Sequence, residues 1–198
     1  MAETFHTFYQ DLPLSTVEKL KKIKMVVLDV DGTISDGGIY LDRGDNELKK
    51  FNCKDGMGIS LLLKAGIEVA LLTGRISPLT ERRAQELRIP HVIQGQMEKE
   101  SALLDLIARC GLSEEQLAVL GDDINDLPLY QHAAVSACPR DGYHYMKTIA
   151  TIVLTSDGGK GATRELSDLI LMAQGLTTPE GNPTFLKERA LKLNAIGQ

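Results

Sequence analysis

Short apolar segments alternate with helical segments along most of this 198-residue chain, and this alternation is the feature that most limits the possible folds. The apolar segments are rich in β-branched residues, which is typical of strands buried on both faces. We expect strands at 24–30, 67–73, 91–93, 117–120, 133–137 and 149–154, and main helices at 55–65, 77–87, 97–110 and 161–174. This order predicts an α/β fold, with right-handed crossovers and a parallel sheet covered by helices on both faces.

Two segments depart from the alternation. Residues 36–52 contain two extended stretches around the turn Asp42-Arg43-Gly44-Asp45, which predicts a small β-hairpin insertion. After Gly175 the chain becomes rich in Thr, Pro and Gly, and an amphipathic helix is expected at 185–196. We therefore divide the chain into a core domain over 1–175, with an N-terminal helix at 15–23, and a tail over 176–198. The tail either reaches a neighbouring subunit or is a loosely attached helix.

The composition excludes several classes of function. The net charge is −5, the pI is about 5.4 and aromatic residues are only 5%, so a surface for nucleic acid or for an anionic membrane is not expected. No apolar run approaches the ~18 residues that span a bilayer. The three cysteines contain no Cys-x-x-Cys pair, which argues against disulfides and a zinc site. We expect a cytoplasmic protein.

Polar residues follow the predicted strands at the points where they end. Asp29 and Asp31 follow the first strand in the run Asp-Val-Asp-Gly-Thr, and Thr73 follows the second. Lys99 lies at the start of the helix after the third strand, and Asp122 follows the fourth, with Asp123 and Asp126 close behind it. Because the carboxyl ends of parallel strands share one edge of the sheet, these side chains should meet there.

Such a cluster has a recognisable chemistry. Several carboxylates cannot all ionise side by side without a cation, and Mg²⁺ is the usual choice where a phosphate also binds. A lysine and a hydroxyl suit the outer oxygens of a phosphoryl group in transfer. One carboxylate can attack phosphorus, and a second, two residues on, can protonate the leaving oxygen and then activate water. The cluster therefore predicts phosphoryl transfer through an aspartyl-phosphate.

Three other interpretations use parts of the same sequence. A calcium loop that starts at Asp29 would need a carboxylate where Tyr40 stands. The turn 158–161 is not a Walker motif, although its backbone N–H groups either line the site or form a plain turn. A phospho-receiver module, which is not an enzyme, also gathers Asp, Thr and Lys, but its acceptor aspartate would follow a middle strand.

Together the runs LDVDGT, LLTGR and GDDIND, with Lys99 between them, resemble the motifs of the haloacid dehalogenase superfamily of phosphohydrolases over residues 24–175. The resemblance implies a Rossmann-like doubly wound fold with Mg²⁺ as cofactor. It implies Asp29 as nucleophile, Asp31 as general acid and base, and Thr73 and Lys99 as holders of the phosphoryl oxygens. The implied metal set is Asp29, the Asp31 backbone carbonyl and Asp122, supported by Asp123 or Asp126.

The lengths of the segments between the motifs restrict the kind of substrate that is expected. The segments 33–73 and 73–99 are too short to contain the cap domains of this superfamily, so no cap domain is expected. An open site suits either a macromolecular substrate or closure by a neighbouring subunit, for which the hairpin at 37–52 offers edges.

The runs FNCKDGMGI and GGKGATREL further resemble a capless, homotetrameric group of the superfamily that acts on small keto-deoxy sugar acid phosphates in lipopolysaccharide precursor synthesis. By matching position, the implied substrate contacts are Asp31, Asn52, Cys53, Lys54, Asp55, Gly56, Arg75, Arg83 and Lys99. The group usually has arginine at the positions of Lys54 and Ser60. An eight-carbon 8-phosphate is the expected substrate, and a nine-carbon 9-phosphate or a phosphoprotein are the alternatives.

Overall fold

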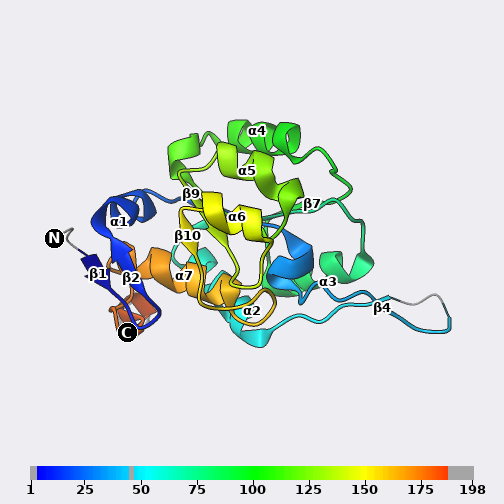
Figure 1. Ribbon diagram of the computed structural model, residues 1–198, viewed down its shortest axis with the longest axis horizontal. Coiled ribbons are helices and arrows are strands. Elements are labelled where there is room, and N and C mark those ends of the chain that lie inside the picture. The colour runs from blue at the N-terminus through cyan, green and yellow to red at the C-terminus, as the bar shows by residue number, and fades with distance from the viewer. Residues whose placement is uncertain (1–3, 45–46, 187–198) are drawn as a thin grey trace, which may run out of the picture.

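The computed structural model describes residues 4–44 and 47–186, and its centre is a parallel sheet (Figure 1). Within these residues the sheet has six strands in the order β10-β9-β8-β3-β6-β7. Their bounds are Met25–Leu28 (β3), Glu68–Leu72 (β6), His91–Ile93 (β7), Leu117–Leu120 (β8), Val135–Cys138 (β9) and Ile152–Val153 (β10). The chain runs outward from β3 to β7, then returns to β8 on the other side of β3. The strand order therefore reverses between β3 and β8, where such sheets bind ligands.

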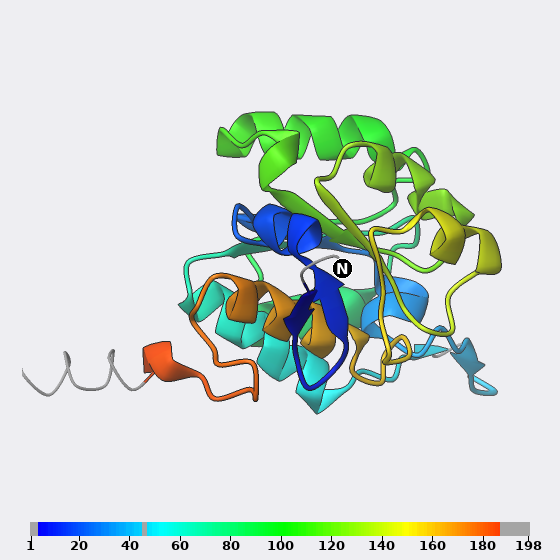
Figure 2. The same ribbon diagram turned by 60° about the vertical axis from the view of Figure 1, so that its left-hand side comes forward.

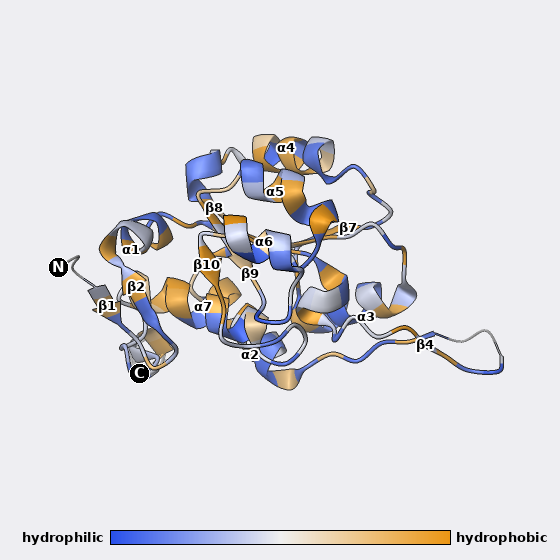
Figure 3. Ribbon diagram, in the orientation of Figure 1, coloured by the Kyte–Doolittle hydropathy of each residue, from blue (hydrophilic) through white to orange (hydrophobic). Residues whose placement is uncertain are grey.

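Helices cover both faces of the sheet, as the alternation predicts (Figures 1 and 2). One layer holds α1 (Leu14–Leu20), α2 (Cys53–Lys64), α3 (Pro78–Leu87) and α7 (Ala162–Ala173), and the other holds α4 (Lys99–Cys110), α5 (Leu127–Gln131) and α6 (His144–Ile149). Val26 and Leu28 of β3 belong to the first core cluster, whereas Met25 and Val27 belong to the second. Every residue of β3 is thus buried, which explains its unbroken apolar run. Hydrophobic residues concentrate on the central strands and on α7 (Figure 3).

Two hairpins lie outside the sheet. The predicted one is formed by β4 (Tyr40–Leu41) and β5 (Glu47–Leu48), which pair antiparallel and extend away from the body (Figure 1). The other, β1 (Thr4–His6) with β2 (Asp11–Pro13), was not expected, because strands of three residues are too short for a periodic pattern. The spacing of Ser15 and Glu18 predicts a capping box at the start of the N-terminal helix, and this prediction is wrong. That helix begins at Leu14 after Pro13, so Ser15 already lies inside it.

The first part of the C-terminal tail packs against the body. Leu176 and Phe185 contact the core cluster, and the backbone N–H of Phe8 donates to the carbonyl of Pro179 over 3.2 Å. The helix expected at 185–196 lies almost wholly outside the described residues. Among the residues that the structure describes, no helix is both long enough and apolar enough to cross a membrane.

Candidate active site

The predicted polar residues meet at the carboxyl edge of the sheet, around one buried ammonium group. Asp29 directly follows β3, and its backbone N–H continues the ladder by donating to Leu120 over 2.9 Å. Lys99 is 0% exposed at the start of α4. Its Nζ lies 2.5 Å from Oδ1 of Asp29 and 2.6 Å from Oδ1 of Asp126. A lysine is buried to this extent only when it is paired, and here it links the loop after β3 to the loop after β8.

The loop after β8 is held by Asp126. Oδ2 of this residue accepts the backbone N–H groups of Asp122 over 3.0 Å and of Asp123 over 3.4 Å. Asp123 and Asp126 also form a capping box around the short turn Ile124–Asp126. The two oxygens of Asp126 thus have separate tasks, one on the loop and one on Lys99.

The loop after β3 brings a second backbone against Asp122. Gly32 has a φ of 81°, which favours glycine, and a Cβ at this position would lie 2.1 Å from Oδ2 of Asp122. Thr33 donates its hydroxyl to Oδ1 of Asp122 over 3.5 Å. The Asp-Gly-Thr part of the motif therefore shapes a close approach between the two loops.

Asp29, Asp122 and Asp126 form a group of three carboxylates, each with one oxygen within 4.8 Å of the others. Burial, reinforced by Asp126, raises the pKa of Asp29 to about 7 against the lowering effect of Lys99. Burial and the charges of Asp29 and Asp126 raise the pKa of Asp122 to about 8. Burial also lowers the pKa of Lys99, but the two carboxylates outweigh it and the net shift is upward. One ammonium does not balance three carboxylates, and this all-oxygen set fits a hard divalent cation such as Mg²⁺.

The carboxylate of Asp31 points to the hairpin. Its Oδ1 forms an ion pair with Nζ of Lys49 and accepts the hydroxyl of Ser35 over 3.4 Å. The Lys49 side chain is only 2% exposed, although Lys49 lies just beyond β5 in an insertion. Lys49 is not among the predicted site residues, because nothing in the local sequence distinguishes it from the neighbouring Lys50.

A cavity of about 240 Å³ opens above the carboxylates, and we call it the cleft. Its lining includes five predicted site residues, which are Asp29, Asp31, Thr73, Arg75 and Asp122. The guanidinium of Arg75 pairs with Glu47 of the hairpin over 2.7 Å, so the hairpin lies along one edge of the cleft. Met97, which is 77% exposed, also lines it and gives the cleft an apolar side.

The remaining predicted substrate contacts are not brought to this cleft in the single chain. Asn52, Asp55, Gly56 and Arg83 line a separate cavity of only about 10 Å³, and the side chains of Cys53 and Lys54 are exposed at the start of α2. Asn52 caps α2 by accepting the N–H of Lys54 over 2.8 Å. The buried carboxylate of Asp55 accepts N–H groups of Gly161 and Arg164 over 3.1 and 2.9 Å, which makes it a cap of α7.

The glycine-rich turn before α7 supports the first loop. A Cβ on Gly158 would lie 1.8 Å from the carbonyl oxygen of Gly32, and Gly159 donates its N–H to the carbonyl of Thr33 over 2.8 Å. The glycines are therefore explained by close backbone packing against the Asp-Gly-Thr loop.

Comparison with known proteins fits this geometry. Residues 84–166 match the model of a haloacid dehalogenase-like hydrolase family. The chain is 44% identical to the 3-deoxy-D-manno-octulosonate 8-phosphate phosphatase KdsC of Haemophilus influenzae, over 80% of this chain and 88% of that protein. The chain belongs to this family of haloacid dehalogenase-like phosphatases.

Solved structures of the family share the fold. The 3-deoxy-D-manno-octulosonate 8-phosphate phosphatase of Yersinia pestis superposes with a TM-score of 0.87 at 38% identity, covering 88% of this chain and 95% of that one. The enzyme of Moraxella catarrhalis, in complex with magnesium, phosphate and KDO, gives a TM-score of 0.79 at 39% identity, covering 81% and 92%. Membership confirms the capless α/β fold and the phosphatase class, and the phospho-receiver interpretation is set aside.

Proposed function

We propose that this protein releases inorganic phosphate from 3-deoxy-D-manno-octulosonate 8-phosphate with the help of Mg²⁺, as a step in lipopolysaccharide precursor synthesis in the cytoplasm. The observation that carries the proposal is the buried ammonium of Lys99, which contacts both Asp29 and Asp126. It holds the Asp29 carboxylate at the point where the strand order of the sheet reverses. The identity to phosphatases of this name and the KDO complex of the Moraxella enzyme support the choice of substrate.

In the proposed reaction Asp29 is the nucleophile. An oxygen of its carboxylate attacks phosphorus, the bond from phosphorus to the sugar oxygen breaks, and Asp31 gives that oxygen a proton. Asp31 then takes a proton from water, whose oxygen attacks the aspartyl-phosphate, frees phosphate and restores Asp29. Thr73 and Lys99 bind the phosphoryl oxygens. The ion pair with Lys49 holds the Asp31 carboxylate in a fixed position beside Asp29.

Asp29, the Asp31 backbone carbonyl and Asp122 would hold the Mg²⁺ ion, with Asp126 positioning the loop that carries Asp122. The bound ion supplies charge that offsets the phosphoryl oxygens and the clustered carboxylates. The short distances between the three carboxylates and their raised pKa values support this assignment.

We propose that the active form is a homotetramer in which a neighbour closes the cleft. The exposed apolar residues of the hairpin, Ile39, Leu41 and Leu48, are 63–71% exposed and suit burial against another copy. The sugar acid carboxylate would be bound by three cations of the predicted contact set, Lys54, Arg75 and Arg83. The other predicted substrate contacts are Asn52, Cys53, Asp55 and Gly56, while Lys99 binds the phosphoryl group. Closure by a neighbour would bring the two parts of this set onto one substrate.

We also propose the division into a core domain over 1–175 and a tail over 176–198.

The test is phosphate release by the purified chain with Mg²⁺ on a panel of three substrates. The panel holds the eight-carbon keto-deoxy 8-phosphate, the nine-carbon keto-deoxy 9-phosphate and a phosphopeptide. We expect the highest kcat/KM for the eight-carbon acid, because the relatives are named for it. A preference for either other substrate, or activity that a chelator leaves unchanged, would overturn the proposal. Light scattering of the same sample tests the tetramer, and a stable monomer would contradict it.

A further inference from the structure

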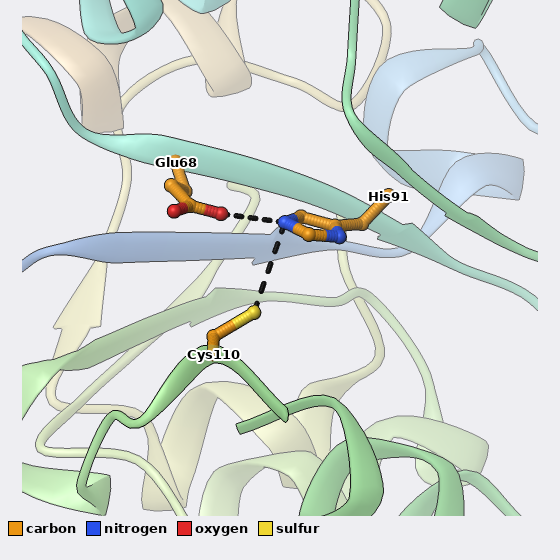
Figure 4. A group of neighbouring side chains, drawn as sticks. All are labelled: Glu68, His91 and Cys110. Carbon is orange, nitrogen blue, oxygen red and sulfur yellow. Dashed lines mark hydrogen bonds and ion pairs between the residues drawn. The ribbon is translucent and has the colours of Figure 1, made fainter. Parts of the chain in front are cut away.

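Three side chains with different donor atoms lie close together, as Figure 4 shows. They lie at the amino end of the sheet, opposite the edge that carries the cleft. Glu68 is the first residue of β6, His91 is the first residue of β7, and Cys110 is the last residue of α4. Parallel pairing sets His91 beside Ala70, so Glu68 leaves β6 on the same face of the sheet, toward α4. The left-handed Gly111 ends α4 at this point and leaves Cys110 next to the ring.

Glu68 and Cys110 both contact the same nitrogen of the His91 ring. Oε2 of Glu68 lies 2.5 Å from Nε2 of His91, and Sγ of Cys110 lies 3.8 Å from that same nitrogen. In a thiol–imidazole–carboxylate relay, the thiol and the carboxylate contact different ring nitrogens, so that a proton passes through the ring. Burial, followed by the charge of Glu68, also raises the pKa of Cys110 despite the opposing effect of Arg109, which leaves the thiol a weak nucleophile. The cluster is therefore not built as a nucleophile.

A cation at the centre satisfies all three groups at once. One donor atom from each residue lies within 4.8 Å of the other two. Zinc binds nitrogen at ~2.0–2.1 Å, carboxylate oxygen at ~2.0–2.2 Å and sulfur at ~2.3 Å, so its ligand atoms stand roughly 3–4 Å apart. The present distance from nitrogen to sulfur fits this range. The Glu68 side chain is 48% exposed, so its carboxylate can turn away from the ring to make room.

We propose that Glu68, His91 and Cys110 form a second metal site, which binds a zinc-class divalent cation with water as the fourth ligand. Thiolate and imidazole ligands select zinc-class ions, whereas Mg²⁺ prefers the oxygens of the cleft. The two sites therefore take different ions from the same solution. The site ties the amino ends of β6 and β7 to the far end of α4, whose first residue is Lys99.

The test uses the intact chain with excess Mg²⁺ to fill the cleft, and Co²⁺ as a spectroscopic probe. We expect a single equivalent of Co²⁺ per chain to produce a thiolate-to-cobalt charge-transfer band, which an all-oxygen site cannot give, and Zn²⁺ to abolish the band by displacement. Cys110→Ser should remove the band, and His91→Gln should weaken Zn²⁺ binding in calorimetry by more than ~10-fold. The matched control is Cys53→Ser, at an exposed cysteine outside the cluster, which should change neither result.

The readouts separate this site from the phosphatase chemistry. Cys110→Ser and His91→Gln should retain Mg²⁺-dependent phosphate release, which also reports that both variants fold. A charge-transfer band that persists in Cys110→Ser, or Zn²⁺ affinity unchanged in His91→Gln, would overturn the second site. Neither result depends on which phosphate ester the cleft hydrolyses.

Discussion

The two ends of the parallel sheet each gather titratable side chains, but they do so by different physical means. At the carboxyl end Asp29, Lys99 and Asp126 are buried and held by charge-assisted hydrogen bonds of 2.5–2.6 Å. At the amino end Glu68 and His91 remain in contact with solvent. Burial makes each charge at the carboxyl end depend on its partners, whereas water screens the charges at the amino end. Substitutions should therefore have far larger effects at the carboxyl end.

The largest effect is expected for Asp29→Asn. An amide oxygen is a poor nucleophile toward phosphorus, so kcat should fall by at least ~10⁴-fold, on the scale seen when a nucleophile is removed. The measurement is phosphate release under saturating Mg²⁺ and substrate, with circular dichroism to confirm the fold. Asp105→Asn is the matched control, since that carboxylate is 68% exposed and pairs with Arg109 in the next turn of α4. Comparable losses in both variants would contradict the assignment of Asp29.

Lys99→Met should have the next largest effect, on stability. It leaves the buried carboxylates of Asp29 and Asp126 without their cation, and breaking a buried pair in this way costs about 3–5 kcal/mol. Guanidinium unfolding without metal measures this loss. The same substitution at Lys160, which is 56% exposed and pairs with Asp157 at 3.6 Å, should change the free energy of unfolding by less than ~1 kcal/mol. Equal losses of unfolding free energy at Lys99 and Lys160 would refute the claim that the buried ion pairs matter more than the exposed one.

The same contrast explains which features the sequence could predict. Asp29 and Asp31, like Asp122 and Asp126, lie a few residues apart and directly after apolar runs, so strand position alone brings them together. Glu68, His91 and Cys110 come from two strand starts and a helix end, and their meeting depends on the register between β6 and β7. Cysteine spacing, which argues against a zinc site, does not reveal such a cluster, because spacing records only ligands that are close in sequence.

Other parts of the site depended on three-dimensional detail that no pattern contains. Lys49 meets Asp31 because the chain that leaves the hairpin runs beside the loop after β3, where Phe51 pairs with Ser35. Asp55 belongs to the run that resembles the family, but its carboxylate caps α7 more than 100 residues away in the chain. A motif therefore indicates that a residue is important, whereas its contacts in the structure show whether it stabilises the fold or takes part in the reaction.

A third prediction concerns pH in the absence of metal. The folded-state pKa values of Asp29 and Asp122 are raised to about 7 and about 8, above the ~3.9 of an unfolded aspartate, so the folded protein binds more protons in between. Stability contributed by these groups is fully present below about pH 4 and is lost as the pH rises from there to the folded-state pKa values of about 7 and about 8. Differential scanning calorimetry in chelator should show a Tm that falls from about pH 4 to about pH 8 and then levels off.

Adding Mg²⁺ gives a second test of the same carboxylates, because the ion replaces bound protons as the positive charge that stabilises them. The increase in Tm on adding Mg²⁺ should therefore grow across the same pH range, and it should shrink in Asp122→Asn. His91→Gln, at the other end of the sheet, should follow the wild-type curve. A Tm in chelator that rises or stays flat with pH would disprove the coupling between the carboxylates.

The smallest effect is expected for Glu68→Gln in the absence of metal. The amide can still accept a hydrogen bond from His91, and the side chain is half exposed, so the free energy of unfolding should change by no more than ~0.5 kcal/mol. With Zn²⁺ present the variant should differ from wild type, because it lacks the charged oxygen ligand and gains less thermal stability from the ion. Thermal unfolding with and without Zn²⁺, in excess Mg²⁺, measures both quantities. A loss of several kcal/mol without metal would mean that the Glu68–His91 contact is structural, and the two ends of the sheet would then differ less than their burial implies.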